Sequence, residues 1–234
     1  MNVRCLFFIP IFVVATIFLG FFSSIAALMD RSGHTSHLFA RYWSRFIFWG
    51  VGIKPTVTGL ENIPKNQAVI FAANHQSTMD IPAMFGFLPV EFRIMAKQIL
   101  FMIPFLGWHL YLGGNIPIDR QNTKKARDSV FKSASQIKKG ISLLIFVEGT
   151  RSRDGKLHRF KRGGFTLAKK LHVPVVPIAI NGTFRLMPAE AWTAAPGKIE
   201  IKIMPPIPED NEPDFVADEV KRELLAAGLE EAPA

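Results

Sequence analysis

The chain has 234 residues, which is enough for one catalytic domain and an appended segment. Its formal net charge of +9 indicates an anionic partner. A mean hydropathy of +0.21, without a zinc-finger or aromatic RNA-binding signature, favours a lipid bilayer over nucleic acid. The single cysteine, Cys5, excludes an internal disulfide and a cysteine-ligated metal cluster.

The N-terminal part of the sequence is apolar. No charged residue lies between Arg4 and Asp30, and a run of about 25 apolar residues is long enough to cross a hydrocarbon core about 30 Å thick. A cleaved signal peptide is the alternative, but its apolar region is shorter, at about 7–15 residues. Further apolar side chains then recur on one helical face: Leu38, Phe39, Tyr42, Trp43, Phe46 and Ile47.

This second pattern is typical of an interfacial amphipathic helix, and an ordinary helix packed on the core is the alternative. We expect residues 1–55 to form a membrane-associated two-helix segment that either spans the bilayer or dips into one leaflet. The nearby basic residues place this side in the cytoplasm by the positive-inside tendency: Arg31, Arg41, Arg45 and Lys54. The expected location is a bacterial inner membrane, with the active site facing the cytoplasm.

From residue 56 onward, short β-rich runs alternate with helical patterns. Strands are predicted over 68–73, 91–95, 141–147, 173–180 and 198–204, and helices over 81–87, 122–139, 165–171 and 214–227. Apolar strands without alternation, such as 143–147, indicate a sheet covered on both faces. We therefore expect an α/β fold with a mostly buried mixed β-sheet flanked by helices. Residues 56–208 form the catalytic domain, and 209–234 form a tail with a short helix.

Several nucleotide-dependent and metal-dependent chemistries have no motif in this sequence. There is no G-x-x-x-x-G-K-[ST], no G-x-G-x-x-G after a strand and no H-E-x-x-H. A covalent serine hydrolase is disfavoured because no nucleophile elbow presents Ser77, which lies only two residues from His75. His34 and His37 fit interfacial polar positions better than metal ligands. We expect neither a metal nor a cofactor.

Residues 74–80, NHQSTMD, follow the apolar run 68–73. On one continuous helix, His75 and Asp80 would point about 140° apart, because each residue advances by about 100°. The two side chains therefore meet only if the chain bends between them. In the alternative interpretation, Asp80 caps a helix in a capping-box spacing with Ser77, and His75 is a loop residue.

Four sequence blocks resemble those of the glycerolipid acyltransferase family. NHQSTMD resembles the family's N-H-x-x-x-x-D, and residues 114–120, GNIPIDR, resemble G-x-I-x-I-D-R. Residues 146–152, FVEGTRS, resemble F-P-E-G-T-R-S, and 173–180, VPVVPIAI, resemble V-P-I-x-P-V. The N-terminal apolar helices also resemble that family's membrane-binding two-helix motif. Two departures are Val147 in place of proline and Ile99 where the family often has glutamate.

The resemblance implies acyl transfer from acyl-CoA or acyl-carrier protein to the sn-2 hydroxyl of lysophosphatidate at the lipid bilayer. His75 is then the general base and Asp80 the carboxylate that orients it, without a covalent acyl-enzyme. The implied substrate-binding residues are Lys97, Arg120, Glu148, Gly149, Thr150 and Arg151.

Arg151 is the first candidate for the phosphate because a guanidinium matches phosphate bidentately. The alternatives are an ion pair with Asp119 for Arg120 and a solvated surface position for Lys97. Three further cations fit electrostatic helpers better than direct ligands: Arg159, Lys161 and Arg162. Three other functions remain open: acylation of another lysolipid such as a lyso-ornithine lipid, thioester hydrolysis, and lipid binding without catalysis.

Overall fold

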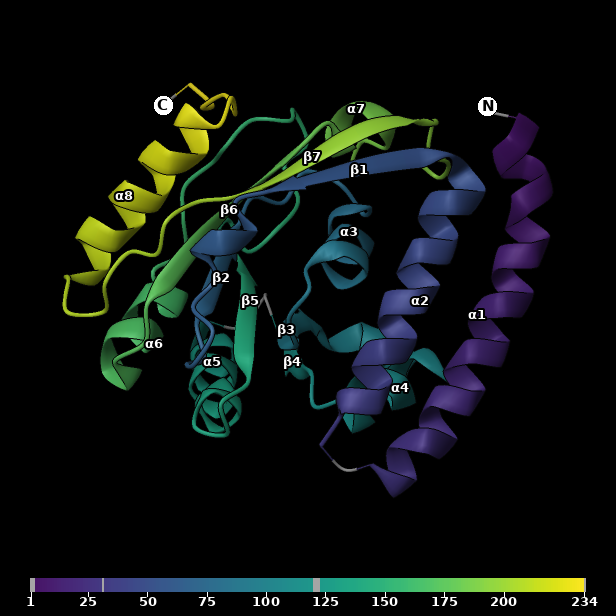
Figure 1. Ribbon diagram of the computed structural model, residues 1–234, viewed down its shortest axis with the longest axis horizontal. Coiled ribbons are helices and arrows are strands. Elements are labelled where there is room, and N and C mark those ends of the chain that lie inside the picture. The colour runs from purple at the N-terminus through teal and green to yellow at the C-terminus, as the bar shows by residue number, and fades with distance from the viewer. Residues whose placement is uncertain (1–2, 31, 120–122, 234) are drawn as a thin grey trace.

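The computed structural model describes residues 3–30, 32–119 and 123–233. Within them, seven strands form one sheet with helices on both faces (Figure 1). The strands are β1 (Ile53–Thr58), β2 (Ile70–Ala73), β3 (Phe92–Lys97), β4 (Ile116–Ile118), β5 (Ser142–Phe146), β6 (Val175–Asn181) and β7 (Gly197–Ile203). The α-helices are α1 (Val3–Met29), α2 (His34–Val51), α3 (Asp80–Phe87), α4 (Leu106–Leu112), α5 (Thr123–Ile137), α6 (Gly163–Leu171), α7 (Thr183–Leu186) and α8 (Pro213–Ala226), and the short 3₁₀ helices are η1 (Leu60–Asn62) and η2 (Gln98–Met102).

The strand order across the sheet is β1-β7-β6-β2-β5-β3-β4. Strands β6, β2, β5, β3 and β4 run parallel to one another, whereas β7 is antiparallel to β6 and carries β1 parallel to itself. The expected α/β fold with a mixed sheet is therefore confirmed. Because β2 lies between β5 and β6, the carboxyl ends of these three strands meet at one edge, where open parallel sheets bind ligands.

The central strand β2 is buried on both faces, which explains its uninterrupted apolar sequence. Successive strand side chains point to opposite faces, so Phe71 and Ala73 pack in one apolar cluster and Ile70 and Ala72 in the other. Helices α2 and α3 complete the first cluster, and α5, α6 and α8 complete the second. The sheet thus holds the loop after β2 on a frame that is packed from both sides.

Every strand and helix predicted for the body of the chain is present, with each end within two residues of its predicted position. Residue 122, the predicted start of one helix, lies outside the described residues. Strands β1 and β4 and helix α4 had no counterpart in the prediction. Strand β1 forms an edge of the sheet and contains Pro55, a residue that removes one ladder donor and is tolerated mainly at such edges.

The two N-terminal helices pack against each other, and α2 lies between α1 and the sheet (Figure 1). Residues 8–29 of α1 form the segment long and apolar enough to cross a membrane, with a mean hydropathy of 2.4 and 11% of that window buried. The apolar stripe predicted on α2 largely faces protein: the rings of Trp43 and Phe46 contact Phe12 and Phe8 of α1. Most of the apolar stripe on α2 is therefore packed against protein, as in the alternative interpretation of an ordinary packed helix. The apolar face on the outside of the molecule belongs to α1.

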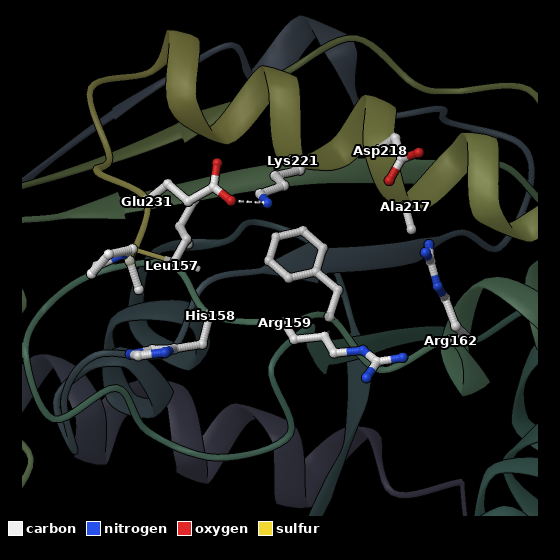
Figure 2. Close-up of a pocket in the computed structure, with 11 residues that line it drawn as sticks. Leu157, His158, Arg159, Arg162, Ala217, Asp218, Lys221 and Glu231 are labelled. Carbon is white, nitrogen blue, oxygen red and sulfur yellow. Dashed lines mark hydrogen bonds and ion pairs between the residues drawn. The ribbon is translucent and has the colours of Figure 1, made fainter.

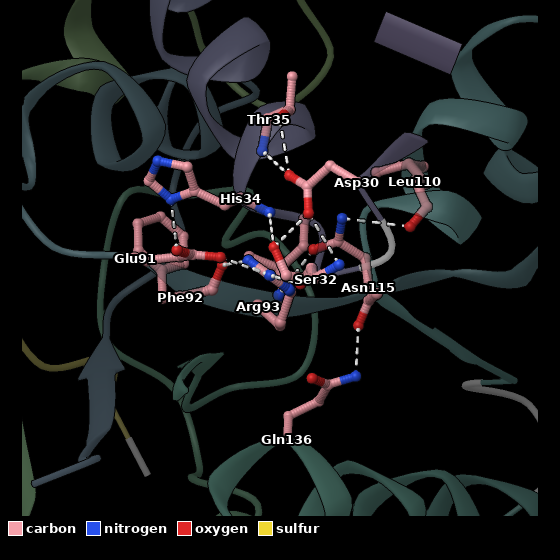
Figure 3. Close-up of polar contacts among 12 residues, drawn as sticks. Asp30, Ser32, His34, Thr35, Glu91, Phe92, Arg93, Leu110, Asn115 and Gln136 are labelled. Carbon is pink, nitrogen blue, oxygen red and sulfur yellow. Dashed lines mark hydrogen bonds and ion pairs between the residues drawn. The ribbon is translucent and has the colours of Figure 1, made fainter. Parts of the chain in front are cut away.

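A polar cluster fastens the turn between α1 and α2 to strand β3 (Figure 3). The Asp30 carboxylate accepts hydrogen bonds from the Ser32 hydroxyl at 2.5 Å and from the Thr35 hydroxyl at 2.6 Å and N–H at 2.8 Å. These bonds, first the one from Ser32, hold the pKa of Asp30 below its usual range. Arg93, only 1% exposed, donates to the Ser32 carbonyl at 2.8 Å and to the Glu91 carboxylate at 2.5 Å. The two terminal nitrogens of this buried guanidinium thus find acceptors in the helical turn and beside β3, while its Nε has no hydrogen-bond partner among the described residues.

Candidate active site

His75 and Asp80 meet in the loop that leaves β2. The imidazole Nδ1 lies 2.9 Å from Asp80 Oδ2, and both side chains are buried. With Nδ1–H donating to the carboxylate, Nε2 of the neutral ring carries the lone pair and is the basic nitrogen. The bend that the sequence required between these residues is present, since α3 begins only at Asp80.

Asp80 also organises the backbone of this loop. Its Oδ2 accepts the backbone N–H groups of Gln76 and Ser77, each at 2.7 Å, and the Ser77 hydroxyl accepts the N–H of Met79 at 3.0 Å. Asp80 is fully buried, and its Oδ1 has no hydrogen-bond partner among the described residues. The same carboxylate oxygen therefore contacts His75 and holds the loop that precedes α3, whereas Met79, the N-cap residue of α3, makes no side-chain capping hydrogen bond.

Contacts with neighbouring strands hold the loop in place from two sides. The Asn74 amide pairs with the backbone of Ile180 on β6, accepting from its N–H at 2.7 Å and donating to its carbonyl at 3.0 Å. On the other side, the N–H of Ser152 donates to the His75 carbonyl at 2.7 Å. His75 is therefore positioned by the ends of both strands that flank β2.

The ring of Phe146, the last residue of β5, stacks on the His75 imidazole. The centroids lie 3.9 Å apart and the planes are inclined by 18°. The parallel register aligns Ala73 with Phe146, so the last residues of the two strands are neighbours. No role was predicted for Phe146 from the sequence. The sequence feature that could have drawn attention to Phe146 is its position as the first residue of the FVEGTRS block.

Glu148 links the loop after β2 to the loop after β5. One carboxylate oxygen accepts the backbone N–H of His75 and the other accepts that of His158, both at 3.2 Å. Burial raises the pKa of the Glu148 carboxyl, while these two hydrogen bonds oppose the shift. In this arrangement Glu148 positions the histidine loop. Its predicted contact with substrate oxygens stays a prediction.

The next three residues leave the sheet, where Gly149 is half-buried and Arg151 is exposed. Gly149 has φ of +72°, a conformation that strongly favours glycine. Thr150 is exposed. The Arg151 guanidinium donates to the Thr78 hydroxyl at 2.5 Å and to the Ala189 carbonyl at 2.8 Å, which places this cation beside the loop that carries His75. The expected meeting of the two blocks at one sheet edge is observed, and the ligand roles stay predictions.

The remaining two predicted cations are Lys97 and Arg120. Lys97 is exposed at the carboxyl end of β3, two strands away from β2. Since neighbouring strands lie about 4.8 Å apart, β3 is about 10 Å from β2 across the sheet. Arg120 lies outside the described residues. Lys97 thus shares the sheet edge with His75, but a different part of it.

A cleft of about 390 Å³ lies between the loop after β5 and helix α8 (Figure 2). Its walls include Arg159, Arg162 and Lys221. Arg162 pairs with Asp214 and Lys221 with Glu231. Neither His75 nor Asp80 lines this cleft. Its connection to the site is indirect, because His158 lines the cleft and its N–H reaches Glu148.

The geometry provides a buried imidazole oriented by a carboxylate, with a cation on the adjacent loop. Such an imidazole can remove a proton from a hydroxyl group that attacks a carbonyl carbon. Comparison with known proteins agrees with this chemistry. A family model described as "Acyltransferase" matches residues 54–181, so the chain belongs to the acyltransferase family. The family resemblance of the four sequence blocks is thus confirmed.

Individual relatives narrow the resemblance within that family. The chain is 38% identical over 175 residues to the 1-acyl-sn-glycerol-3-phosphate acyltransferase of Pseudomonas aeruginosa, covering 73% of this chain and 67% of the relative. It is 34% identical over 200 residues to a chloroplastic 1-acyl-sn-glycerol-3-phosphate acyltransferase of Brassica napus, covering 84% of this chain and 57% of the relative. It therefore spans little more than half the length of that plant protein.

One solved structure is similar over nearly the whole chain. It is the crystal structure of the 1-acyl-sn-glycerophosphate (LPA) acyltransferase PlsC from Thermotoga maritima, with a TM-score of 0.82 and 29% sequence identity. The similarity covers 98% of this chain and 97% of that protein. It includes the N-terminal helices as well as the sheet, so the attachment of the helical pair to the α/β body is shared.

Proposed function

We propose that this protein transfers a fatty acyl group from an acyl thioester to the sn-2 hydroxyl of lysophosphatidate, giving phosphatidate. The observation that carries the proposal is the buried 2.9 Å contact between His75 and Asp80 at the carboxyl edge of the sheet. The names of the relatives support the acceptor, and either acyl-CoA or acyl-carrier protein fits as the donor.

In the proposed reaction, Nε2 of His75 removes the proton of the glycerol hydroxyl as its oxygen attacks the thioester carbonyl carbon. The tetrahedral intermediate then collapses, the carbon–sulfur bond breaks, and the imidazolium returns its proton to the leaving thiolate. Asp80 stabilises the imidazolium between these steps and fixes its tautomer. Phe146 holds the ring plane from one side. No acyl-enzyme forms, so both substrates are bound together.

The phosphate of the acceptor is assigned to Arg151, with Lys97, at the carboxyl end of β3, and Arg120 as the other candidate cations. A guanidinium binds a phosphate through two parallel hydrogen bonds, and Arg151 would exchange its contacts with Thr78 and Ala189 for them. Gly149 allows the backbone to approach the glycerol, and Thr150 offers an exposed hydroxyl.

The proposed setting is a bacterial inner membrane, with α1 in contact with lipid and the active site facing the cytoplasm. Residues 1–55 would hold the enzyme on the bilayer, 56–208 would carry the chemistry, and 209–234 would form the tail that contains α8. Substrate and product are both lipids, so attachment to the bilayer places the site where they reside.

An acyl-transfer assay with purified protein tests the proposal. Lysophosphatidate, a lysophospholipid and a lyso-ornithine lipid are offered as acceptors, each with acyl-CoA and with acyl-carrier protein as donor. Phosphatidate formation that depends on His75 supports the proposal. Preference for another lysolipid shows that this lipid, and not lysophosphatidate, is the acceptor. Release of free fatty acid without an acceptor indicates a thioesterase. Lipid binding without turnover indicates a non-catalytic protein.

A further inference from the structure

A second uncharged stretch lies on the surface, far from the N-terminus in sequence. Residues 98–118 contain no Asp, Glu, Lys or Arg, and they include η2 and α4. Several large apolar side chains there face solvent instead of the core: Ile99, Met102, Ile103, Trp108 and Tyr111. Met102 and Tyr111 are 74% and 72% exposed. Apolar groups this exposed and this close in sequence indicate a surface that contacts something other than water.

This surface, which we call the η2–α4 surface, is joined to the outer apolar helix. The ring of Phe105 contacts that of Phe21 in an edge-to-face arrangement with centroids 6.3 Å apart. The Ser23 hydroxyl lies 2.6 Å from Nδ1 of His109. Residues of α1 and α4 are therefore directly connected, and Figure 1 shows the two helices on the same side of the molecule. Anything that covers α1 along this stretch also reaches α4.

We propose that the η2–α4 surface is a second bilayer contact, which seats the catalytic body on the same leaflet as α1. This inference rests on the proposed membrane association of the protein. A lipid interface suits the surface because Trp108 and Tyr111 are the residue types that concentrate at membrane–water boundaries. The lack of charge over the whole stretch removes the cost of burying ions in lipid.

The position of the surface gives it a role in substrate delivery. Residue Lys97, at the carboxyl end of β3, immediately precedes η2, so the lipid contact begins at the sheet edge that holds the site. The β3 strand lies about 10 Å from β2, which leads into the His75 loop. A lysolipid can therefore pass from the leaflet to the base by moving along the sheet edge, without leaving the membrane surface.

Site-directed spin labelling tests this contact on the full-length protein. In a Cys5→Ser background, labels are placed by Met102→Cys, Tyr111→Cys and Phe215→Cys. Phe215 is the matched control because it is also an exposed large apolar residue, 53% exposed, but lies on α8 across the sheet from α1 (Figure 1). The protein is bound to vesicles of equal parts phosphatidylcholine and phosphatidylglycerol. Collision with oxygen, which enters lipid, is compared with collision with a water-soluble nickel complex.

On vesicle binding, the ratio of oxygen to nickel collisions is expected to rise severalfold at 102 and 111 and to stay unchanged at 215. Ratios at 102 and 111 that match 215 overturn the proposal. Low collision with both reagents also overturns it, because the surface is then covered by protein, such as a second copy of the chain.

An activity comparison separates this inference from the proposed reaction. Met102→Ser with Tyr111→Ser is expected to raise KM for long-chain lysophosphatidate in vesicles severalfold, while a water-soluble short-chain acceptor is used as before. An equal loss with both acceptors counts against a role in delivery. Absence of transfer by the wild-type protein refutes the proposed function alone, because the spin-label result needs no turnover.

Discussion

Replacing Asp80 by asparagine tests the central claim of the site, since it removes a charge while keeping the shape. The carboxylate is fully buried, and its Oδ2 accepts the His75 N–H and two backbone N–H groups. An amide oxygen can still accept these bonds, so the loop is expected to keep its conformation. What disappears is the attraction between a negative carboxylate and the imidazolium that forms during the reaction.

The size of that attraction follows from the contact distance. With 2.9 Å between Nδ1 and Oδ2, the two charge centres lie about 4 Å apart. At an effective dielectric constant of about 20, unit charges at that distance attract by about 4 kcal/mol. One decade of rate corresponds to about 1.4 kcal/mol, so kcat is expected to fall by about 10³ in Asp80→Asn.

The assay is phosphatidate formation at saturating donor, together with thermal unfolding of the same preparations. Ser77→Ala is the matched control, because the Ser77 hydroxyl bonds Met79 N–H and the Met187 carbonyl without touching His75. It should lower stability with little change in kcat. If Asp80→Asn instead behaves like Ser77→Ala, with lower stability and nearly normal turnover, the carboxylate is a helix cap and the dyad mechanism is refuted.

Four further predictions concern the base, the phosphate site, the loop link and the membrane segment. His75→Ala should lower turnover by about 10²–10⁴ in vesicle assays, with folding and membrane binding intact. Arg151→Lys should lower kcat/KM for lysophosphatidate about 10–100-fold more than for an acceptor without a phosphomonoester, because it keeps charge but loses the planar fork. Glu148→Gln should lower the free energy of unfolding by about 1–3 kcal/mol, measured by denaturant titration, because the new amide can leave one buried N–H unpaired. Removing residues 1–52 should release the protein from vesicles or aggregate it, whereas high salt should not extract the intact chain in sedimentation assays.

The effect of Glu148 on stability should also depend on pH. Burial raises the pKa of this carboxyl above its ordinary value of 4.5, so the folded state favours the protonated form. Its contribution to stability is fully present below pH 4.5 and is lost as pH rises through the folded-state pKa. Glutamine does not titrate, so the stability gap between wild type and Glu148→Gln should narrow as pH increases through that range.

Each of these predictions has a contrary result. Near-normal turnover by a folded His75→Ala protein removes the general base from the mechanism. Equal losses for both acceptors in Arg151→Lys move the phosphate site to Lys97 or Arg120. A stability gap that widens with pH contradicts the raised pKa of Glu148. Extraction of the intact chain by salt shows that its attachment is mainly electrostatic.

Much of the fold was predictable because the central strands are buried on both faces. An uninterrupted apolar run such as 143–147 marks such a strand directly. Strand β1 was missed because its sequence, Ile-Lys-Pro-Thr-Val-Thr, mixes exposed polar residues with a proline at the edge of the sheet. Helix α4 was missed because its uncharged sequence has no polar face to mark a helical period.

In the site, contacts between residues close in sequence were predicted, and contacts between residues far apart in sequence were not. The meeting of His75 with Asp80 was implied by the resemblance of NHQSTMD to the family's block, because the spacing alone required a bend and left a capping role open. The stacking of Phe146 on His75 depends on strand register, which aligns Ala73 with Phe146 and has no signature in either segment alone. Likewise, the pairing of Asn74 with Ile180 joins residues 106 positions apart. Long-range contacts of this kind become visible only in the folded structure.

The contacts of Arg93 limit how this protein can be truncated or combined with segments of its relatives. The Arg93 guanidinium is buried and finds its acceptors in the α1–α2 turn and in Glu91. Cutting away the helical pair would leave a desolvated charge on β3 without the Ser32 carbonyl, a loss of the kind that breaks folds. Removal of the two N-terminal helices is therefore expected to destabilise the α/β body. A chimera that takes its helices from a relative must keep an α1–α2 turn whose carbonyl can accept from Arg93, as that of Ser32 does, beside the Glu91 carboxylate.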